Sequence, residues 1–124
     1  MKKGWILLAG LLVSSFSFAE NCDSTRNTYD AVHCDNKVYA NADNELNKIY
    51  QQLHAKLNTS QKSVLKQSQL AWIRDRDASC TSPSDVGPVI STRCQLTKTQ
   101  ERNSWLRERL RECNTVGCKT NSLK

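Results

Sequence analysis

Apolar residues recur along most of this chain at the three- and four-residue spacing of an α-helix. The first such stretch carries one apolar stripe with a second row beside it, made of Val38, Tyr39, Ala42, Leu46, Ile49, Tyr50, Leu53 and Leu57. The polar run Asn58-Thr59-Ser60 interrupts the pattern and offers N-cap residues, so a second helix is predicted from about Gln61 to Cys80. Because the break is short, we expect the two helices to be antiparallel neighbours.

Residues 81–88, TSPSDVGP, contain both prolines and form the clearest loop of the sequence. A third helix follows, with a bundle-like seam that has two polar interruptions and consists of Leu96, Thr99, Asn103, Leu106, Leu110 and Cys113. It is expected to end near Cys113, and Ser24 or Thr25 is expected to begin a short helical turn leading into Cys34. No stretch alternates like a strand. The pattern predicts an all-α fold, a small antiparallel bundle of three main helices plus a short N-terminal helical segment.

Residues 1–19 have the pattern of a secretory signal peptide, because Lys2 and Lys3 precede an apolar run that gives way to small residues ending at Ala19. The run is too short to span a bilayer, and no long apolar segment follows it. Cys22 lacks the small apolar residues that precede a lipoprotein cysteine, so no lipid anchor is expected. We therefore expect residues 20–124 to form a single soluble domain in the periplasm, with a short C-terminal tail.

All six cysteines lie beyond this leader, and an even number in an exported chain favours disulfides over metal or redox chemistry. Sequence alone does not decide between the many pairings that six cysteines allow. We expect neighbours to pair, as Cys22–Cys34, Cys80–Cys94 and Cys113–Cys118. The middle pair has the strongest basis, because it would clamp the loop of residues 81–89 between two predicted helices.

Positive charge is concentrated in the last part of the chain. Residues 20–124 contain sixteen basic and twelve acidic residues, a net charge of +4, while the part from Arg93 onward has a local net charge of +5. Such a helix face would attract anionic envelope polymers or an acidic protein surface. A solvated helix face explains the same pattern equally well.

Motifs for catalysis are missing from the sequence. His33 and His54 do not form a metal-binding pair, there is no glycine-rich phosphate loop, and no serine lies in a nucleophile-elbow context. We expect a protein that is not an enzyme and has no metal site, no cofactor and no nucleic-acid partner.

The segment of residues 69–80, QLAWIRDRDASC, turns Trp72 and Arg76 toward the core when it is read as a helix. An arginine facing a core must find a carboxylate or carbonyl partner, because an unpaired buried charge is costly. Asp43 and Glu45 flank the apolar stripe of the first long helix. One of them is expected to form an ion pair with Arg76 that fixes the register of the two helices.

Trp105 lies away from the seam of the third helix, and Arg102 and Arg109 are three and four residues from it. Tryptophan and arginine are the residue types most enriched in interface hot spots, so an exposed Trp105 would form a contact surface with the two arginines. The other interpretation is that Trp105 covers Ile90 and the Cys80–Cys94 bridge.

Taken together, these residues resemble the lysozyme inhibitor LprI-like family of exported bacterial domains. The matching signature comprises Cys34, Ala42-Asp43-Asn44-Glu45-Leu46-Asn47 with Tyr50, Gln69, Trp72, Arg76, Asp77 and Cys80, and finally Cys94, Thr97, Arg102 and Leu106. It covers nearly all of residues 20–124. The resemblance implies a small helical domain that binds and inhibits lysozyme outside the cytoplasm.

Two features depart from that family's pattern, namely the missing lipoprotein cysteine and the positive net charge. Animal lysozymes are mostly basic, so long-range electrostatics would oppose association, and inhibition would need a local acidic or polar loop. The loop around Asp85 is the projecting candidate. The sequence thus predicts a binding protein for lysozyme or another peptidoglycan-cleaving enzyme. The alternative is an envelope-associated structural or stress module whose basic last helix binds anionic cell-wall or outer-membrane polymers.

Overall fold

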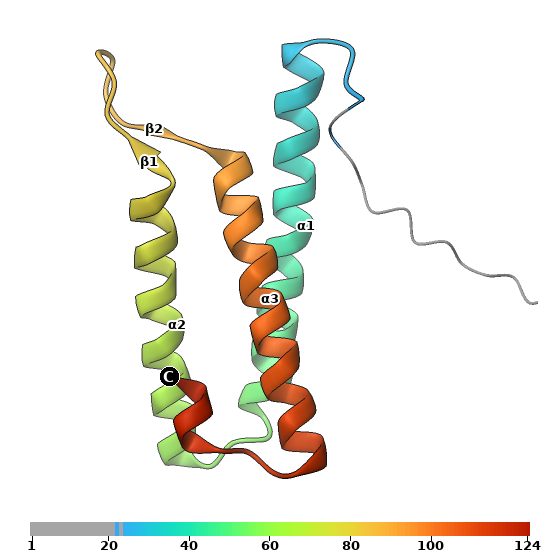
Figure 1. Ribbon diagram of the computed structural model, residues 1–124, viewed down its shortest axis with the longest axis vertical. Coiled ribbons are helices and arrows are strands. Elements are labelled where there is room, and N and C mark those ends of the chain that lie inside the picture. Colours follow the sequence, from blue (N-terminus) through green and yellow to red (C-terminus); the bar gives the residue numbers. More distant parts are fainter. Residues whose placement is uncertain (1–21, 23) are drawn as a thin grey trace, which may run out of the picture.

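The computed structural model describes Cys22 and residues 24–124, so the predicted signal peptide lies outside the described residues. The chain forms three long helices, which are α1 (Thr28–His54), α2 (Thr59–Ser79) and α3 (Thr92–Thr115) (Figure 1). Between α2 and α3 lies a small hairpin of β1 (Thr81–Ser82) and β2 (Val89–Ile90), and the chain ends in a 3-10 helix, η1 (Thr120–Leu123). The predicted all-α fold of three main helices is confirmed.

Each long helix begins after a residue whose side chain caps its first turn. Asn27 Oδ1 accepts a hydrogen bond of 2.9 Å from the backbone N–H three residues later, and Ser91 Oγ accepts the equivalent bond at 3.2 Å. Asn58 and Gln61 form a reciprocal capping box, with bonds of 2.9 and 3.1 Å. These bonds satisfy N–H groups that a helix leaves unpaired, and so determine where each helix starts.

The N-terminal helical segment is not a separate element. Residues 28–34 are the first turns of α1, which continues without a break to His54. The apolar residues of these turns, Tyr29 and Val32, are exposed, so they add nothing to the buried stripe that marks the rest of the helix. The sequence pattern therefore did not reveal the continuity.

The two strands are antiparallel, with Thr81 opposite Ile90 and Ser82 opposite Val89. The sequence pattern predicts a loop here and no strand. Strands of two residues are too short to show an alternating pattern, which is why the hairpin was not foreseen.

An aliphatic core fills the end of the bundle where α1 turns into α2. Its buried members are Leu46, Ile49, Leu53, Leu57, Leu65, Leu106 and Leu123. Leu123 is only 1% exposed, although it stands alone in the polar tail. The tail turns back at Gly117, whose φ of +101° favours glycine, and η1 then packs against α2 (Figure 1). The tail thus closes the core, where the sequence had predicted only a short polar extension.

The three disulfides join the predicted pairs, Cys22–Cys34, Cys80–Cys94 and Cys113–Cys118. The second spans the base of the hairpin, and the third ties the returning tail to the end of α3. In the part of the chain that the structure describes, no helix is long and apolar enough to cross a membrane.

Replacing Leu123 with alanine should lower the free energy of unfolding by about 2–4 kcal/mol, because it leaves a cavity in a core that nothing else fills. Val116 is 71% exposed and serves as the control. Val116→Ala should change stability by less than about 0.5 kcal/mol. Urea unfolding followed by circular dichroism measures both, and similar losses for the two variants would contradict the role of the tail in the core.

Candidate functional site

Arg76 is buried as predicted, at 9% exposure, but its predicted ion pair with Asp43 or Glu45 is wrong. Its Nε donates to Asp77 Oδ1 at 3.0 Å. Glu45 instead pairs with Arg107 on α3. The reason lies in the packing, because α1 runs alongside α3 for much of its length and meets α2 far less closely. Glu45 therefore reaches the third helix and not the second.

Arginine and aromatic side chains alternate through the space between the helices. In spatial order they are Tyr39 on α1, Arg76 and Trp72 on α2, and Arg102, Trp105 and Arg109 on α3, and we call this set the cation–π ladder. The Arg76 guanidinium carbon lies 5.9 Å from the ring centre of Tyr39 and 5.0 Å from that of Trp72. The Arg102 carbon lies 5.7 Å from Trp72 and 3.9 Å from Trp105, and the Arg109 carbon lies 5.5 Å from Trp105. All five distances are within cation–π range, so the ladder links all three helices.

Arg102 occupies the middle of the ladder and is 8% exposed. Its Nε donates to Gln69 Oε1 at 2.9 Å and its Nη2 donates to Ser68 Oγ at 3.0 Å. Burial lowers the pKa of Arg102 to about 10, and the nearby Tyr50 phenol acts weakly in the opposite direction. A pKa of about 10 leaves the side chain charged at neutral pH. Two ring faces and two neutral acceptors thus hold a buried cation that has no ion pair with any described carboxylate.

The predicted contact surface of Trp105, Arg102 and Arg109 is therefore mostly interior. Trp105 is half-buried against the aliphatic core, and Arg109 Nε lies 3.9 Å from Glu112 Oε2 while its Nη1 donates to the tail carbonyl of Ser122 at 3.4 Å. The other interpretation of Trp105 does not hold either, since Ile90 remains 58% exposed. Arg102 and Trp105 stabilise the bundle and are not a free docking face.

Asp85 lies at the tip of the hairpin, which projects beyond the ends of α2 and α3 (Figure 1). Three apolar side chains of the hairpin are open to solvent, with Val86 95% exposed, Ile90 58% and Val89 51%. Asp85 is the only charged residue between Cys80 and Ser91. The hairpin therefore offers an apolar contact surface with one negative charge.

Contacts at both ends of the hairpin hold its shape. At the tip, the Gly87 N–H donates to the Ser84 carbonyl at 3.1 Å. At the base, the Cys80–Cys94 disulfide joins the two arms, and Thr81 Oγ1 donates to the Asp77 carbonyl of α2 at 2.6 Å. A loop that is already ordered loses less conformational entropy when it binds a partner.

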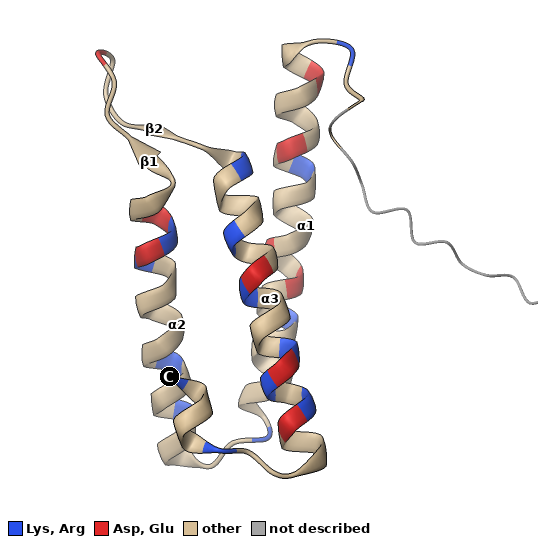
Figure 2. Cartoon of the chain, in the orientation of Figure 1, with Lys and Arg blue, Asp and Glu red and all other residues tan. Residues whose placement is uncertain are grey.

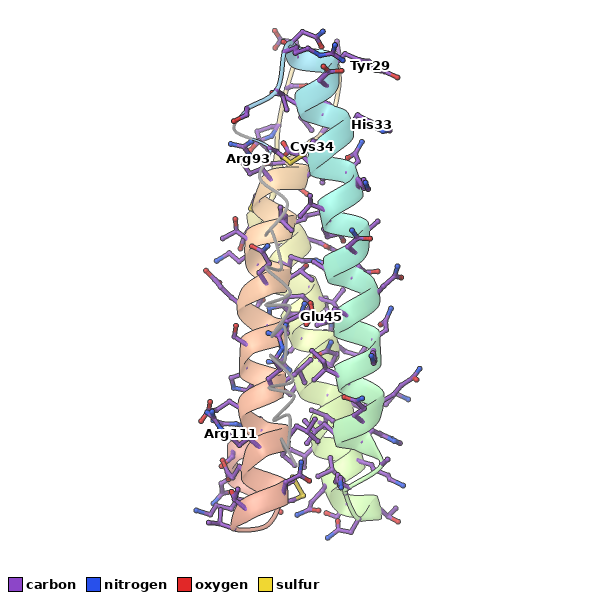
Figure 3. The ribbon with its side chains drawn as sticks, turned by 90° about the vertical axis from the view of Figure 1, so that its right-hand side faces the viewer. Tyr29, His33, Cys34, Glu45, Arg93 and Arg111 are labelled. Atoms are coloured by element: carbon purple, nitrogen blue, oxygen red, sulfur yellow. A yellow bond between two sulfur atoms is a disulfide. The ribbon has the colours of Figure 1, made fainter. Side chains whose placement is uncertain are left out.

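The first turns of α1 expose further apolar side chains at the same end of the bundle (Figures 1 and 3). Tyr29 is 78% exposed and Val32 52%, and the Tyr29 ring stacks on His33 with 6.3 Å between ring centres. Arg93 Nη2 lies 3.4 Å from Asp35 Oδ1 and ties this part of α1 to α3. Sequence patterns do not identify these residues, because nothing in a local pattern distinguishes an exposed tyrosine from a buried one.

Net positive charge lies mainly away from the hairpin (Figure 2). On α3, the exposed Arg107 and Arg111 form ion pairs with Glu45 and Glu108, so much of the basicity of the last helix is locally balanced. Five lysines occupy the turn between α1 and α2, the first half of α2 and the tail, namely Lys56, Lys62, Lys66, Lys119 and Lys124. The basic surface therefore lies at the end of the bundle where α1 turns into α2, which we call the closed end.

A groove of about 310 Å³ lies between α1 and α2. It is lined by Asp43, Leu46, Asn47 and Tyr50 from α1, and by Lys66, Gln69, Leu70, Ile73 and Arg76 from α2. Burial raises the pKa of Tyr50, and the charge of Arg102 acts in the opposite direction. Over Cys22 and residues 24–124, no three histidine, cysteine or acidic side chains are grouped to hold a metal ion.

Replacing Arg102 with alanine should destabilise the protein by about 2–4 kcal/mol, since it removes the stacking between two indoles and leaves Gln69 and Ser68 without their donor. Arg111 is the matched control, an exposed arginine on the same helix. Arg111→Ala should cost less than about 1 kcal/mol. Thermal and urea unfolding measure both, and equal effects would show that the cation–π ladder does not stabilise the bundle.

Comparison with known proteins gives one family. The model described as lysozyme inhibitor LprI matches residues 19–106, a range that includes the hairpin, the groove and most of the cation–π ladder. No curated protein and no solved structure matches the chain. Because the family model covers more than half of the sequence and agrees with the helical fold, this chain belongs to the LprI family of lysozyme inhibitors.

Proposed function

We propose that this protein acts outside the cytoplasm as a non-enzymatic inhibitor that binds a lysozyme or another peptidoglycan-cleaving enzyme. Family membership supports inhibition as the activity. The observation that carries the proposal is the hairpin, which projects from the bundle and leaves Val86 95% exposed. An apolar side chain exposed to that degree on an ordered loop is suited to filling a cavity in a partner.

Electrostatics favour an approach with the hairpin first. The closed end carries the five lysines, whereas Asp85 is the only charge of the hairpin. A basic enzyme is repelled by the closed end and meets little repulsion at the hairpin. The charge distribution therefore favours encounters in which the hairpin faces the enzyme. In the complex, the tip would occupy the substrate cleft and exclude the polysaccharide, with Asp85 facing basic residues at the rim.

Val86→Asp should weaken inhibition at least about tenfold, because a charge replaces an apolar side chain at the centre of the contact. Val116→Asp is the matched control, since Val116 is also an exposed valine, 71% accessible, but lies at the opposite end of the bundle. It should leave inhibition unchanged. Lysis of bacterial cells or purified cell wall by a lysozyme, titrated with each variant, gives the inhibition constants.

Two outcomes would contradict this proposal. If micromolar wild-type protein inhibits none of several lysozyme types and no other peptidoglycan-cleaving enzyme, the inhibitor function is wrong. If inhibition occurs but both valine variants inhibit like the wild type, the hairpin is not the contact surface.

The five lysines at the closed end support the alternative function, which is binding to anionic envelope polymers. The contact residues then differ from those expected from the sequence, because Arg102 is buried and the lysines are the more accessible cations. Binding to lipopolysaccharide or lipoteichoic acid should fall steeply with added salt. The double variant Lys62→Ala/Lys119→Ala should weaken it, and Lys48→Ala, in the last third of α1 and outside the set of five lysines, should weaken it less. Binding that is insensitive to salt would exclude this function.

A further inference from the structure

We propose that the groove between α1 and α2 binds a short saccharide that carries a carboxylate group. This site is separate from the hairpin and goes beyond the inhibition proposed above. Four features of the groove support this ligand class, namely its unpaired polar groups, its apolar floor, its charged side chains and its size.

Four polar side chains line the groove without a hydrogen bond or ion pair to any other described residue. They are Asp43, Asn47, Tyr50 and Lys66. The two deeper polar residues already have hydrogen-bond partners within the protein, since Gln69 accepts from Arg102 and Arg76 donates to Asp77. The outer four thus offer a carboxylate acceptor, an ammonium donor, and an amide and a phenol that both donate and accept.

Apolar side chains lie between these polar groups. Leu46 is 3% exposed, Ile73 is half-buried and Leu70 is 44% exposed. An uncovered leucine beside unpaired polar groups fits a ligand that has both a hydroxyl-bearing edge and an apolar face of C–H groups. A pyranose ring has both features.

The walls of the groove favour a sugar over an extended peptide. Both walls are the middle turns of α-helices, whose backbone N–H and C=O groups bond within the helix. A peptide strand placed there finds no backbone partners for its own amide groups. Hydroxyl groups can pair with the side chains instead, because each both donates and accepts.

Charge and size narrow the ligand class further. Arg76 is already paired with Asp77, so the unpaired charges of the groove are Lys66 and Asp43, which offer one position for an anionic group and one for a hydrogen-bond donor. Lys66 is the exposed cation and the partner for a carboxylate. The volume of about 310 Å³ is at the lower end of the range for ligand pockets, which suits one or two sugar rings.

Two disaccharides that differ by one carboxylate test the proposal on the full mature protein. The first is N-acetylglucosamine linked to N-acetylmuramic acid, and the second is diacetylchitobiose, which lacks the lactyl carboxylate. In NMR titrations, both should shift the backbone signals of residues lining the groove, and the acidic disaccharide should bind more tightly. Lys66→Ala should weaken the acidic disaccharide by about tenfold and remove its advantage over the neutral one.

Matched controls lie on the same helices. Lys48→Ala removes the same charge from an exposed position outside the groove, and Asn44→Ala is the counterpart of Asn47→Ala. Asn47→Ala should weaken both disaccharides, whereas the two controls should bind like the wild type. Because the hairpin is intact in all these variants, lysozyme inhibition should be unchanged, and Val86→Asp should retain saccharide binding.

The proposal is overturned if neither disaccharide shifts groove signals at millimolar concentration, or if Lys48→Ala lowers affinity as much as Lys66→Ala does. An acidic peptide that binds the groove better than either sugar would assign the site to a different ligand class. Equal affinities for the two disaccharides would remove the carboxylate from the proposal. None of these results depends on whether the protein inhibits an enzyme.

Discussion

The packing of α2 against α3 depends on one buried guanidinium group, which lies between two indole rings. Arg102 keeps its charge in the interior, and Trp72 and Trp105 surround it from two different helices. Because a buried charge without such neighbours would be very costly, α2 is held against α3 in the register that places Trp72, Gln69 and Ser68 beside Arg102. The aliphatic core seals only the closed end of the bundle. Trp72 and Trp105 pack against that core, and Arg76 and Tyr39 continue the cation–π ladder from Trp72 to α1.

Local chemistry explains which parts of the fold were predictable. The break at Asn58 and the long helices follow from side-chain spacing and capping, which act over a few residues, whereas the disulfide pairs matched the assumption that neighbouring cysteines pair. The partner of Arg76 depended instead on which helices are close neighbours, and spacing within one helix carries no such information. Leu123 shows the same limit, since a single apolar residue in a polar tail has no periodicity to mark it as buried.

The candidate site shows where reasoning from residue types fails. Trp105 and the arginines beside it have the composition of an interface hot spot, yet a stack inside a protein has the same composition and spacing. Only the burial of the side chains distinguishes an interface hot spot from an internal stack. The projecting loop around Asp85 was predicted from its prolines and its disulfide. The exposure of Val86 was not, because it depends on the three-dimensional position of the tip beyond the helices. The groove draws its walls from segments far apart in the chain, so no single motif indicated it.

The hairpin also bears on how such a protein changes over time. Val86 at its tip is 95% exposed, and the Cys80–Cys94 disulfide at its base joins the two arms whatever residues lie between them. Substitutions at the tip should therefore have little effect on folding, and if the hairpin is the contact surface, selection acts on them through the partner. A scaffold of this kind can follow a rapidly diverging target while its interior stays constant. Relatives with the same bundle and different tips would then recognise different enzymes.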